Sequence, residues 1–303
     1  MALEKRKCFI ALSTLPILLN TQFWRWQRSS TNTAASCWLD GIIYAICRGG
    51  WPYSLIQSDR ERSLLIAKDL FQQTCEVDIS NVDGVRRNPT LAKSLLRSYS
   101  RNICQLADNR TIIADVNANN AFSESSYYDY IGALEKLYMV SDVEAWCPAI
   151  RSKTVIRSGR KRNLVDPSIA VTALGIGPKY FNTDFKTLGF LFESLCIRDL
   201  KIYLSGCGGH VSYYHDRYGL EADAVLHLED GRYAICEVKL GQDDVDEGAK
   251  HLVEMERLIQ EYNKKEKQVP LSLPTLKMVI TGTEYGYRRD DGVLVIPIAC
   301  LRD

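Results

Sequence analysis

The stretch "EADAVLHLEDGRYAICEVKLG", Glu221 to Gly241, decides the fold of the C-terminal half because it reads as two strands joined by a tight turn. Side chains alternate between the two faces of a strand, so Glu237 and Lys239 project from the same face. A three-residue loop that closes on Gly231 in the left-handed region puts Asp223 opposite Glu237. A two-residue loop would instead send the Asp223 carboxylate to the other face. The sequence Glu-Asp-Gly favours the longer loop, and we therefore expect Asp223, Glu237 and Lys239 to converge.

Carboxylates that are forced together raise each other's pKa, and a hard divalent cation relieves their repulsion while keeping several waters as ligands. We therefore expect Asp223 and Glu237 to hold Mg²⁺, with Mn²⁺ as an alternative. Bound to such an ion, a water loses its proton more readily, and the ammonium group of Lys239 can orient that water or stabilise a charged phosphate. The pattern thus predicts a phosphodiesterase site with Asp223, Glu237 and Lys239 as its catalytic residues. Glu193 and Glu221 are candidate additional ligands.

A simpler interpretation of the same residues stays open. Glu237 and Lys239 can form a surface salt bridge without any metal, and Asp223 can be an acidic residue that merely lies near a turn. The setting favours the metal site, because a helix that carries Glu193 precedes the hairpin and another helix follows it.

The rest of the C-terminal half alternates between strands and helices. Apolar spacing predicts a helix over 187–204 and a second over 243–267, the latter beginning with a capping box of Asp244 and Glu247. Strands are expected at 211–214, 222–228, 233–240, 276–281 and 293–298. This pattern predicts an α/β domain.

The middle of the chain is predicted to be helical. We expect an amphipathic helix over 59–80, a helix that starts at Asn88-Pro89, a short helix over 112–118 and a helix capped by Ser123. Two β-rich pieces follow, and three helices with a two-stranded flap are the pattern of a winged helix-turn-helix. The third helix is acidic, which argues against a DNA-groove reader. The flap is basic at positions 157 and 160–162, which keeps phosphate contact open.

The predicted fold is therefore mixed α/β (α+β). Residues 1–50 form an N-terminal connector, residues 51–175 a helical winged-helix-like domain, and residues 176–303 a nuclease-like α/β domain. The formal net charge is +1, so any nucleic-acid surface must be a local patch.

The cysteines and the N-terminal segment bear on the cellular compartment of the protein and on contact with a membrane. Ten scattered cysteines without a C-x-x-C motif favour a reducing, cytoplasmic location. The segment "KRKCFIALSTLPILLN" (Lys5 to Asn20) has the basic start and short apolar run of a secretory signal. Glu4 and Pro16 argue against a signal, and the run is too short to span a bilayer. We expect a short strand followed by a connector, and no membrane partner.

Three segments resemble the C-terminal domain of a large prokaryotic family of AAA-type ATPases: "LGFLFESLCIRDLKIY", "YYHDRYGLEADAVL" and "AICEVKLG". "GGWP" and "NLVDPSIAVTALG" are also similar to the family. That domain is catalogued as of unknown function and resembles the PD-(D/E)xK restriction-endonuclease-like fold. The resemblance implies that Asp223 and Glu237 are metal ligands, that Lys239 is the catalytic lysine, and that Glu193 is a helix glutamate near the metal. It also implies a winged helix in the middle of the chain.

The chain departs from this family at its start. Members begin with an ATPase module, whereas the sequence contains no G-x-x-x-x-G-K-[ST] phosphate loop. The residues before Arg48 resemble the end of the ATPase region, so we expect a truncated, split or reduced member that uses no ATP.

The leading hypothesis is a Mg²⁺-dependent nuclease-like protein that acts on DNA phosphodiesters. The competing hypothesis is a non-catalytic interaction or regulatory module that pairs with a separate ATPase or another protein. A positively charged rim around the carboxylates would favour the nuclease. The four histidines are too dispersed for a local zinc motif. His251 lies about one turn into the helix that follows Glu-x-Lys, so it could face the site, but we expect it to be an exposed helical residue.

Overall fold

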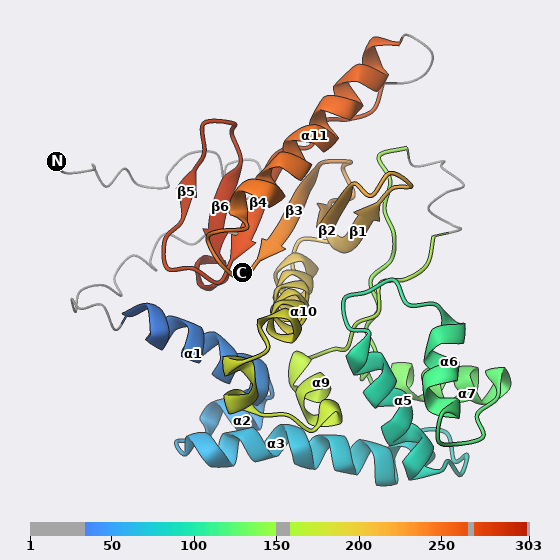
Figure 1. The fold of residues 1–303 in the computed structure, drawn as a ribbon. Coiled ribbons are helices and arrows are strands. Elements are labelled where there is room, and N and C mark those ends of the chain that lie inside the picture. Colours follow the sequence, from blue (N-terminus) through green and yellow to red (C-terminus); the bar gives the residue numbers. More distant parts are fainter. Residues whose placement is uncertain (1–33, 150–157, 266–269, 302–303) are drawn as a thin grey trace. The chain divides into compact units, whose positions relative to one another are not determined.

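The computed structural model describes residues 34–149, 158–265 and 270–301 (Figure 1). The fold is mixed α+β, as predicted: a helical region is followed by a domain built on a six-stranded sheet. Two compact units are formed, and each is described by itself. Asp40–Ala145 and Arg157–Arg198 make the helical unit, and Asp199–Asp303 is the main part of the sheet unit. The predicted strand within residues 5–20 lies outside the described residues, and the predicted domain ranges stay predictions.

The helical unit follows the predicted order of helices, with additional ones at both ends. Asn88 caps α5 by accepting a hydrogen bond from the Thr90 amide, and Ser123 caps α7 by accepting one from the Ser126 amide, as expected. The elements are α1 (Ala34–Arg48), α2 (Pro52–Ile56), α3 (Arg60–Gln73), a π-helical turn (Thr74–Asp78), α4 (Ile79–Asn81), α5 (Pro89–Arg101), α6 (Asn109–Asn117), α7 (Glu124–Lys136), α9 (Pro167–Leu174), a 3-10 turn (Pro178–Asn182) and α10 (Phe185–Ser205), which continues into the sheet unit.

The flap after α7 pairs with the segment before α9. Val143 and Lys161 exchange two backbone hydrogen bonds of 2.9 Å, and Val140 bridges Leu164 in the same antiparallel sense. The helical unit therefore contains the predicted helices, and two isolated bridges join the segments that were expected to form the flap. The winged-helix arrangement stays a prediction.

Two turns that are far apart in the sequence meet inside the helical unit. Asp166 caps α9 through the Ser168 amide and also accepts a hydrogen bond of 2.8 Å from the Gly50 amide. The indole of Trp51 donates to the hydroxyl of Ser168 at 2.9 Å. Gly49 has φ +77°, and a Cβ there would lie 2.5 Å from the Ser168 hydroxyl oxygen and 2.8 Å from an Asp166 carboxylate oxygen. The turn thus requires glycine both for its backbone and for this close approach.

The sheet unit contains one mixed sheet with the strand order β1-β2-β3-β4-β6-β5. β1, β2 and β3 form an antiparallel meander, β4 is parallel to β3, β6 is parallel to β4, and β5 is antiparallel to β6. The strands are β1 (His210–His215), β2 (Glu221–His227), β3 (Tyr233–Lys239), β4 (Leu276–Thr281), β5 (Tyr287–Arg288) and β6 (Leu294–Pro297). All five predicted strands are present, and β5 is the one that the sequence pattern missed.

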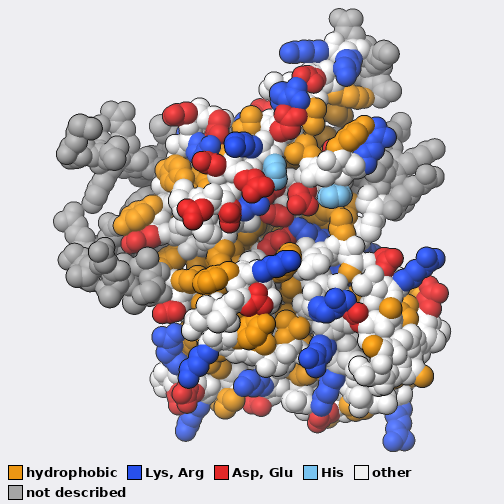
Figure 2. All heavy atoms as spheres, viewed as in Figure 1, with side chains coloured by type: hydrophobic (Ala, Val, Ile, Leu, Met, Phe, Trp, Pro, Cys, Tyr) orange, Lys and Arg blue, Asp and Glu red, His pale blue; other side chains and the backbone are white. Residues whose placement is uncertain are grey.

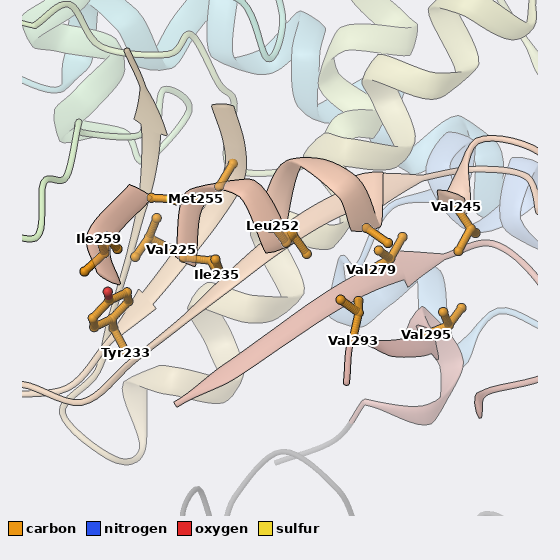
Figure 3. Packing of buried hydrophobic residues seen from close by; sticks show 12 residues of the cluster. Val225, Tyr233, Ile235, Val245, Leu252, Met255, Ile259, Val279, Val293 and Val295 are labelled. Carbon is orange, nitrogen blue, oxygen red and sulfur yellow. The ribbon is translucent and has the colours of Figure 1, made fainter. Parts of the chain in front are cut away.

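The helix α11 (Val245–Lys264) makes the parallel crossover from β3 to β4 and covers one face of the sheet (Figure 1). Its apolar side packs on strand residues that include Val225, Ile235 and Val279, as Figure 3 shows. Leu252 is fully buried there, and burial of such a side chain contributes about 1.5–3 kcal/mol. The expected capping box is wrong: Asp244 already has helical backbone angles (φ −90°, ψ −4°), and its side chain makes no capping hydrogen bond.

Candidate functional site

The hairpin between β2 and β3 has the expected three-residue loop. Leu228 and Arg232 pair across it through a 2.9 Å backbone hydrogen bond, and Gly231 has φ +87°. Ala224 is the partner of Cys236, so the same register places Asp223 opposite Glu237. The two carboxylates therefore lie on one face of neighbouring strands, as the sequence predicts. Both side chains are buried: Asp223 is 9% exposed and Glu237 is 1% exposed.

Lys239 completes the predicted group. Its ammonium lies 3.0 Å from Oε2 of Glu237. Burial, together with the negative charge of Asp223, raises the pKa of Glu237 to about 8, although Lys239 acts in the opposite direction. Burial acts to lower the pKa of Lys239, but the carboxylates of Glu237, Asp223 and Glu247 outweigh it and raise that pKa. The lysine is therefore a cation that is shared among several carboxylates.

The backbone contributes a further contact. The amide of Val238 donates a hydrogen bond of 2.9 Å to Oδ2 of Asp223. This contact holds the Asp223 side chain against the strand that carries Glu237 and Lys239.

His251 faces the site, and the expectation of an exposed helical histidine is wrong. Its Nδ1 lies 3.4 Å from Oε1 of Glu237, so His251 and Lys239 approach opposite oxygens of one carboxylate. Gly248, one turn earlier in α11, explains this approach: a Cβ there would lie only 3.1 Å from Lys239 Cε and 3.2 Å from Glu237 Cβ. A glycine within a helical pattern signals such a close approach, and it could have favoured the site-facing position of His251 from the sequence.

Glu193 is engaged elsewhere. It belongs to the helical unit, where its Oε1 lies 2.5 Å from the ammonium of Lys161, and both side chains are about 10% exposed, at 11% and 10%. This buried ion pair ties α10 to the flap. The role of Glu193 as a metal ligand stays a prediction.

Glu221 lies at the start of β2 with its side chain 50% exposed, and Nδ1 of His215 lies 3.4 Å from its Oε2. Its charge also acts to raise the pKa of Glu237, which places it near the site. Together with four exposed carboxylates on the segment that follows β3, Glu221 forms a group that we call the acidic rim. Its members are Glu221, Asp243, Asp244, Asp246 and Glu247. Acidic side chains gather over the start of α11 in Figure 2. Asp246 is paired with Arg289, but the five carboxylates still outnumber this cation. The rim is thus the opposite of the positive one that a nuclease favours.

The basic flap does not provide a free cationic surface over its described residues. Arg160 lies 3.4 Å from Glu144, Lys161 is paired with Glu193, and the buried Arg162 lies 2.9 Å from Asp142. The cations at positions 160–162 therefore stabilise the helical unit, and phosphate contact by them is not supported.

The donor set fits a hard, largely hydrated cation. Within the described residues, no group of three or more His, Cys, Asp or Glu side chains is arranged to hold a metal ion. Asp223 and Glu237 provide two carboxylates in facing positions, and Mg²⁺ is commonly held by one or two carboxylates with waters as its other ligands. The carboxylate pair is therefore compatible with Mg²⁺ and poorly suited to a cation that requires a full cage of protein ligands.

Comparisons with known proteins identify two domains. The family model described as Domain of unknown function (DUF8612) matches residues 39–180, and the one described as Domain of unknown function (DUF4143) matches residues 188–301. Residues 39–180 are therefore similar to the DUF8612 domain and residues 188–301 to the DUF4143 domain, a type often found alongside AAA ATPase modules. The predicted resemblance is confirmed in this coarser form, and "GGWP" and "NLVDPSIAVTALG" fall within the DUF8612 match.

No curated protein and no solved structure matches the chain. Among the helices that the structure describes, none is both long and apolar enough to cross a membrane.

Proposed function

We propose that the chain is a metal-dependent, nuclease-like protein that acts on DNA phosphodiesters, and that its DUF4143 domain has the restriction-endonuclease-like fold. One observation carries the proposal: Asp223 stands opposite Glu237 on neighbouring strands while the Lys239 ammonium lies 3.0 Å from Glu237. The resemblance of the sequence to the C-terminal domain of the AAA-type ATPase family predicts this set of residues on this pair of strands. The proposed location is the cytoplasm.

The roles of the residues follow from their chemistry. Asp223 and Glu237 hold Mg²⁺ or Mn²⁺ through their facing carboxylates. When bound, such an ion lowers the pKa of a coordinated water and neutralises charge on a phosphoryl oxygen. Lys239 orients the attacking water and stabilises negative charge on the phosphate. Two cationic or polar groups fix the orientation of the Glu237 carboxylate: His251 lies 3.4 Å from its Oε1, and Lys239 lies 3.0 Å from its Oε2.

A second candidate function is supported by a different observation. The acidic rim repels a polyanion, so the sheet unit is also suited to a role without catalysis. In that case the chain is an interaction or regulatory module for a separate ATPase or another protein, and Asp223, Glu237 and Lys239 form a buried polar cluster that serves the fold.

Nicking of supercoiled plasmid in Mg²⁺ and in Mn²⁺ separates the two functions. The comparison uses the wild-type chain, Asp223→Asn and the matched control Asp230→Asn, whose carboxylate lies on the exposed turn beside Arg232. The nuclease proposal expects metal-dependent nicking by the wild type and the control, and its loss in Asp223→Asn. Equal nicking by all three proteins would indicate a contaminant, and no nicking by any of them would favour the interaction module.

A further inference from the structure

Two histidines that are far apart in the sequence come together at the edge of the sheet. His210 begins β1 and His227 ends β2, and the antiparallel register makes them direct cross-strand partners. Their ring centroids lie 5.6 Å apart, with an angle of 35° between the ring planes. Directly opposed residues of an antiparallel pair project their side chains from the same face. We call these two residues the histidine pair.

The histidine pair is separate from the carboxylate pair. His227 follows Asp223 by four residues on β2, which corresponds to about 13 Å along a strand. Residues two and four apart on a strand share a face, so the fully buried Val225 lies between Asp223 and His227 on that face. One face of the sheet therefore carries two polar groups of different chemistry, oxygen donors at one end of β2 and nitrogen donors at the other.

The surroundings of His227 favour its neutral form. The side chain is half-buried, and Trp146 of the sheet unit lies beside it with 6.5 Å between the ring centroids. Burial, together with the neighbouring His210, lowers the pKa of His227 below its ordinary value of 6.5. A neutral imidazole keeps a lone pair on one ring nitrogen, and this is the form that binds a metal ion.

The histidine pair also differs from the other two histidines in its partners. His215 and His251 each have a ring nitrogen 3.4 Å from a carboxylate oxygen. Neither member of the histidine pair has a carboxylate partner of this kind among the residues that the structure describes. No negative charge therefore favours protonation of these two rings, and their mutual repulsion opposes it.

We propose that the histidine pair binds one transition-metal ion of the class that prefers nitrogen ligands, of which Zn²⁺ is the representative. Imidazole suits zinc, copper, iron and nickel, whereas Mg²⁺ prefers oxygen. Bonds of about 2.0–2.1 Å from Zn²⁺ to imidazole nitrogen place the centroids of two ligating rings about 4.5–6 Å apart. The observed separation of 5.6 Å falls within this range. The inference goes beyond the proposed function, because it adds a second metal site of another class.

Ser212 supplies the outer contact that a ligating histidine commonly has. It is 8% exposed, follows His210 by two residues on β1, and its hydroxyl oxygen lies 3.1 Å from Nε2 of His227. Metal-bound histidines usually donate their second ring N–H to an oxygen, which fixes the tautomer and the ring orientation. When Ser212 accepts the Nε2–H, the lone pair of His227 is on Nδ1.

The ion keeps open positions at this site. Within the described residues no group of three or more His, Cys, Asp or Glu side chains is arranged to hold a metal ion, so the histidine pair supplies two ligands of the usual four. His210 is exposed, and water from the solvent completes the coordination. The bound ion joins the first residue of β1 to the last residue of β2, so it should stabilise the folded protein.

Isothermal titration of Zn²⁺ into the full chain, with Mg²⁺ in excess, tests the inference. The decisive variant is His210→Gln, and His215→Gln is the matched control, since His215 is an exposed histidine of the same strand. Asp223→Asn removes the carboxylate pair. We expect the wild type, His215→Gln and Asp223→Asn to bind Zn²⁺ alike, and His210→Gln to bind it at least about tenfold more weakly. Zn²⁺ should also raise the unfolding midpoint of the wild type more than that of His210→Gln.

The contrast between the two histidine variants decides the outcome, because the cysteines of the chain also offer ligands to Zn²⁺. Unchanged Zn²⁺ affinity in His210→Gln, or an equal loss in His215→Gln, would overturn the inference. Absence of Zn²⁺ binding to the wild type would overturn it as well. Loss of Zn²⁺ binding in Asp223→Asn with full binding in His210→Gln would place the ion at the carboxylate pair instead. The nuclease proposal stands or falls separately, since its test measures nicking in Mg²⁺ and Mn²⁺.

Discussion

The Val238 amide donates a 2.9 Å hydrogen bond to Oδ2 of Asp223, so the first proposed metal ligand is anchored to the strand that carries the second. Val238 lies between Glu237 and Lys239, whose side chains leave the strand on one face. The functional group is therefore assembled by one strand pair, and changes to that pair or to α11 above it should alter metal binding before they alter the fold.

The stability of the metal-free protein should fall as pH rises through the range in which Glu237 titrates. The folded-state pKa of about 8 lies above the ordinary value of 4.5, so the folded protein binds the proton more tightly than the unfolded chain. This contribution to stability is present below pH 4.5 and is lost progressively up to about pH 8. Glu237→Gln should remove it. Thermal unfolding midpoints of both proteins in EDTA from pH 5 to 9 check this, and parallel curves would contradict it.

Gly248→Ala should disturb the site without unfolding the helix. Alanine normally stabilises a helix interior by about 0.5–1 kcal/mol relative to glycine. At position 248 the new Cβ meets Lys239 and Glu237 at 3.1 and 3.2 Å, so that gain should be lost and metal affinity should drop several-fold. In Gly132→Ala, on α7, the Cβ meets nothing within 4 Å, and we expect only the gain. Urea unfolding and metal titration measure both effects. Equal behaviour of the two variants would exclude the close approach of α11.

The ion pair of Lys161 and Glu193 should behave as a structural contact. Removal of one partner from a buried pair costs about 3–5 kcal/mol, because it leaves an uncompensated charge. Lys161→Met and Glu193→Leu should each destabilise the protein by about that amount, and the double variant should recover most of the loss. Denaturant unfolding of the four proteins gives the coupling. If Glu193→Leu instead lost metal binding while its stability hardly changed, Glu193 would be a ligand.

Gly49→Ala should be strongly destabilising because two costs add. Its φ of +77° disfavours any side chain, and the Cβ would collide with Ser168, Trp51 and Asp166 at 2.5–2.8 Å. Gly84→Ala provides the matched control, since Gly84 has φ +74° with nothing within 4 Å of the added carbon. We expect a loss of about 1–2 kcal/mol for the control, from its backbone alone, and a clearly larger loss for Gly49→Ala. Similar losses would show that the contacts of Gly49 contribute nothing.

Local signals explain which parts of this molecule could be predicted from sequence. The hairpin register followed from Glu-Asp-Gly, because a loop that closes on a left-handed glycine fixes which residues face each other. Asn88 and Ser123 marked helix starts for the same kind of reason, since their side chains accept hydrogen bonds from amides two or three residues ahead. These features depend on a few neighbouring residues, and their chemistry allows few other conformations.

Contacts between distant parts of the chain could not be predicted in this way. Lys161 and Glu193 are 32 residues apart, and neither residue carries a signal of its partner. The position of His251 after Glu-x-Lys allowed it to face the site, but the sequence could not decide between that and an exposed position, because periodicity describes a helix face and not how closely that face approaches a strand. The acidic rim also required the structure, since Glu221 and Glu247 lie on separate elements that come together only around Lys239 and Glu237.

Isothermal titration of Mg²⁺ and of Mn²⁺ into the wild-type chain and into Asp223→Asn tests the central claim most directly. The account predicts binding at a single site in the wild type and its loss in the variant, with the unfolding midpoint of the metal-free variant close to that of the wild type. Absence of binding in the wild type, or equal binding in both proteins, would contradict the claim that Asp223 and Glu237 hold a divalent ion.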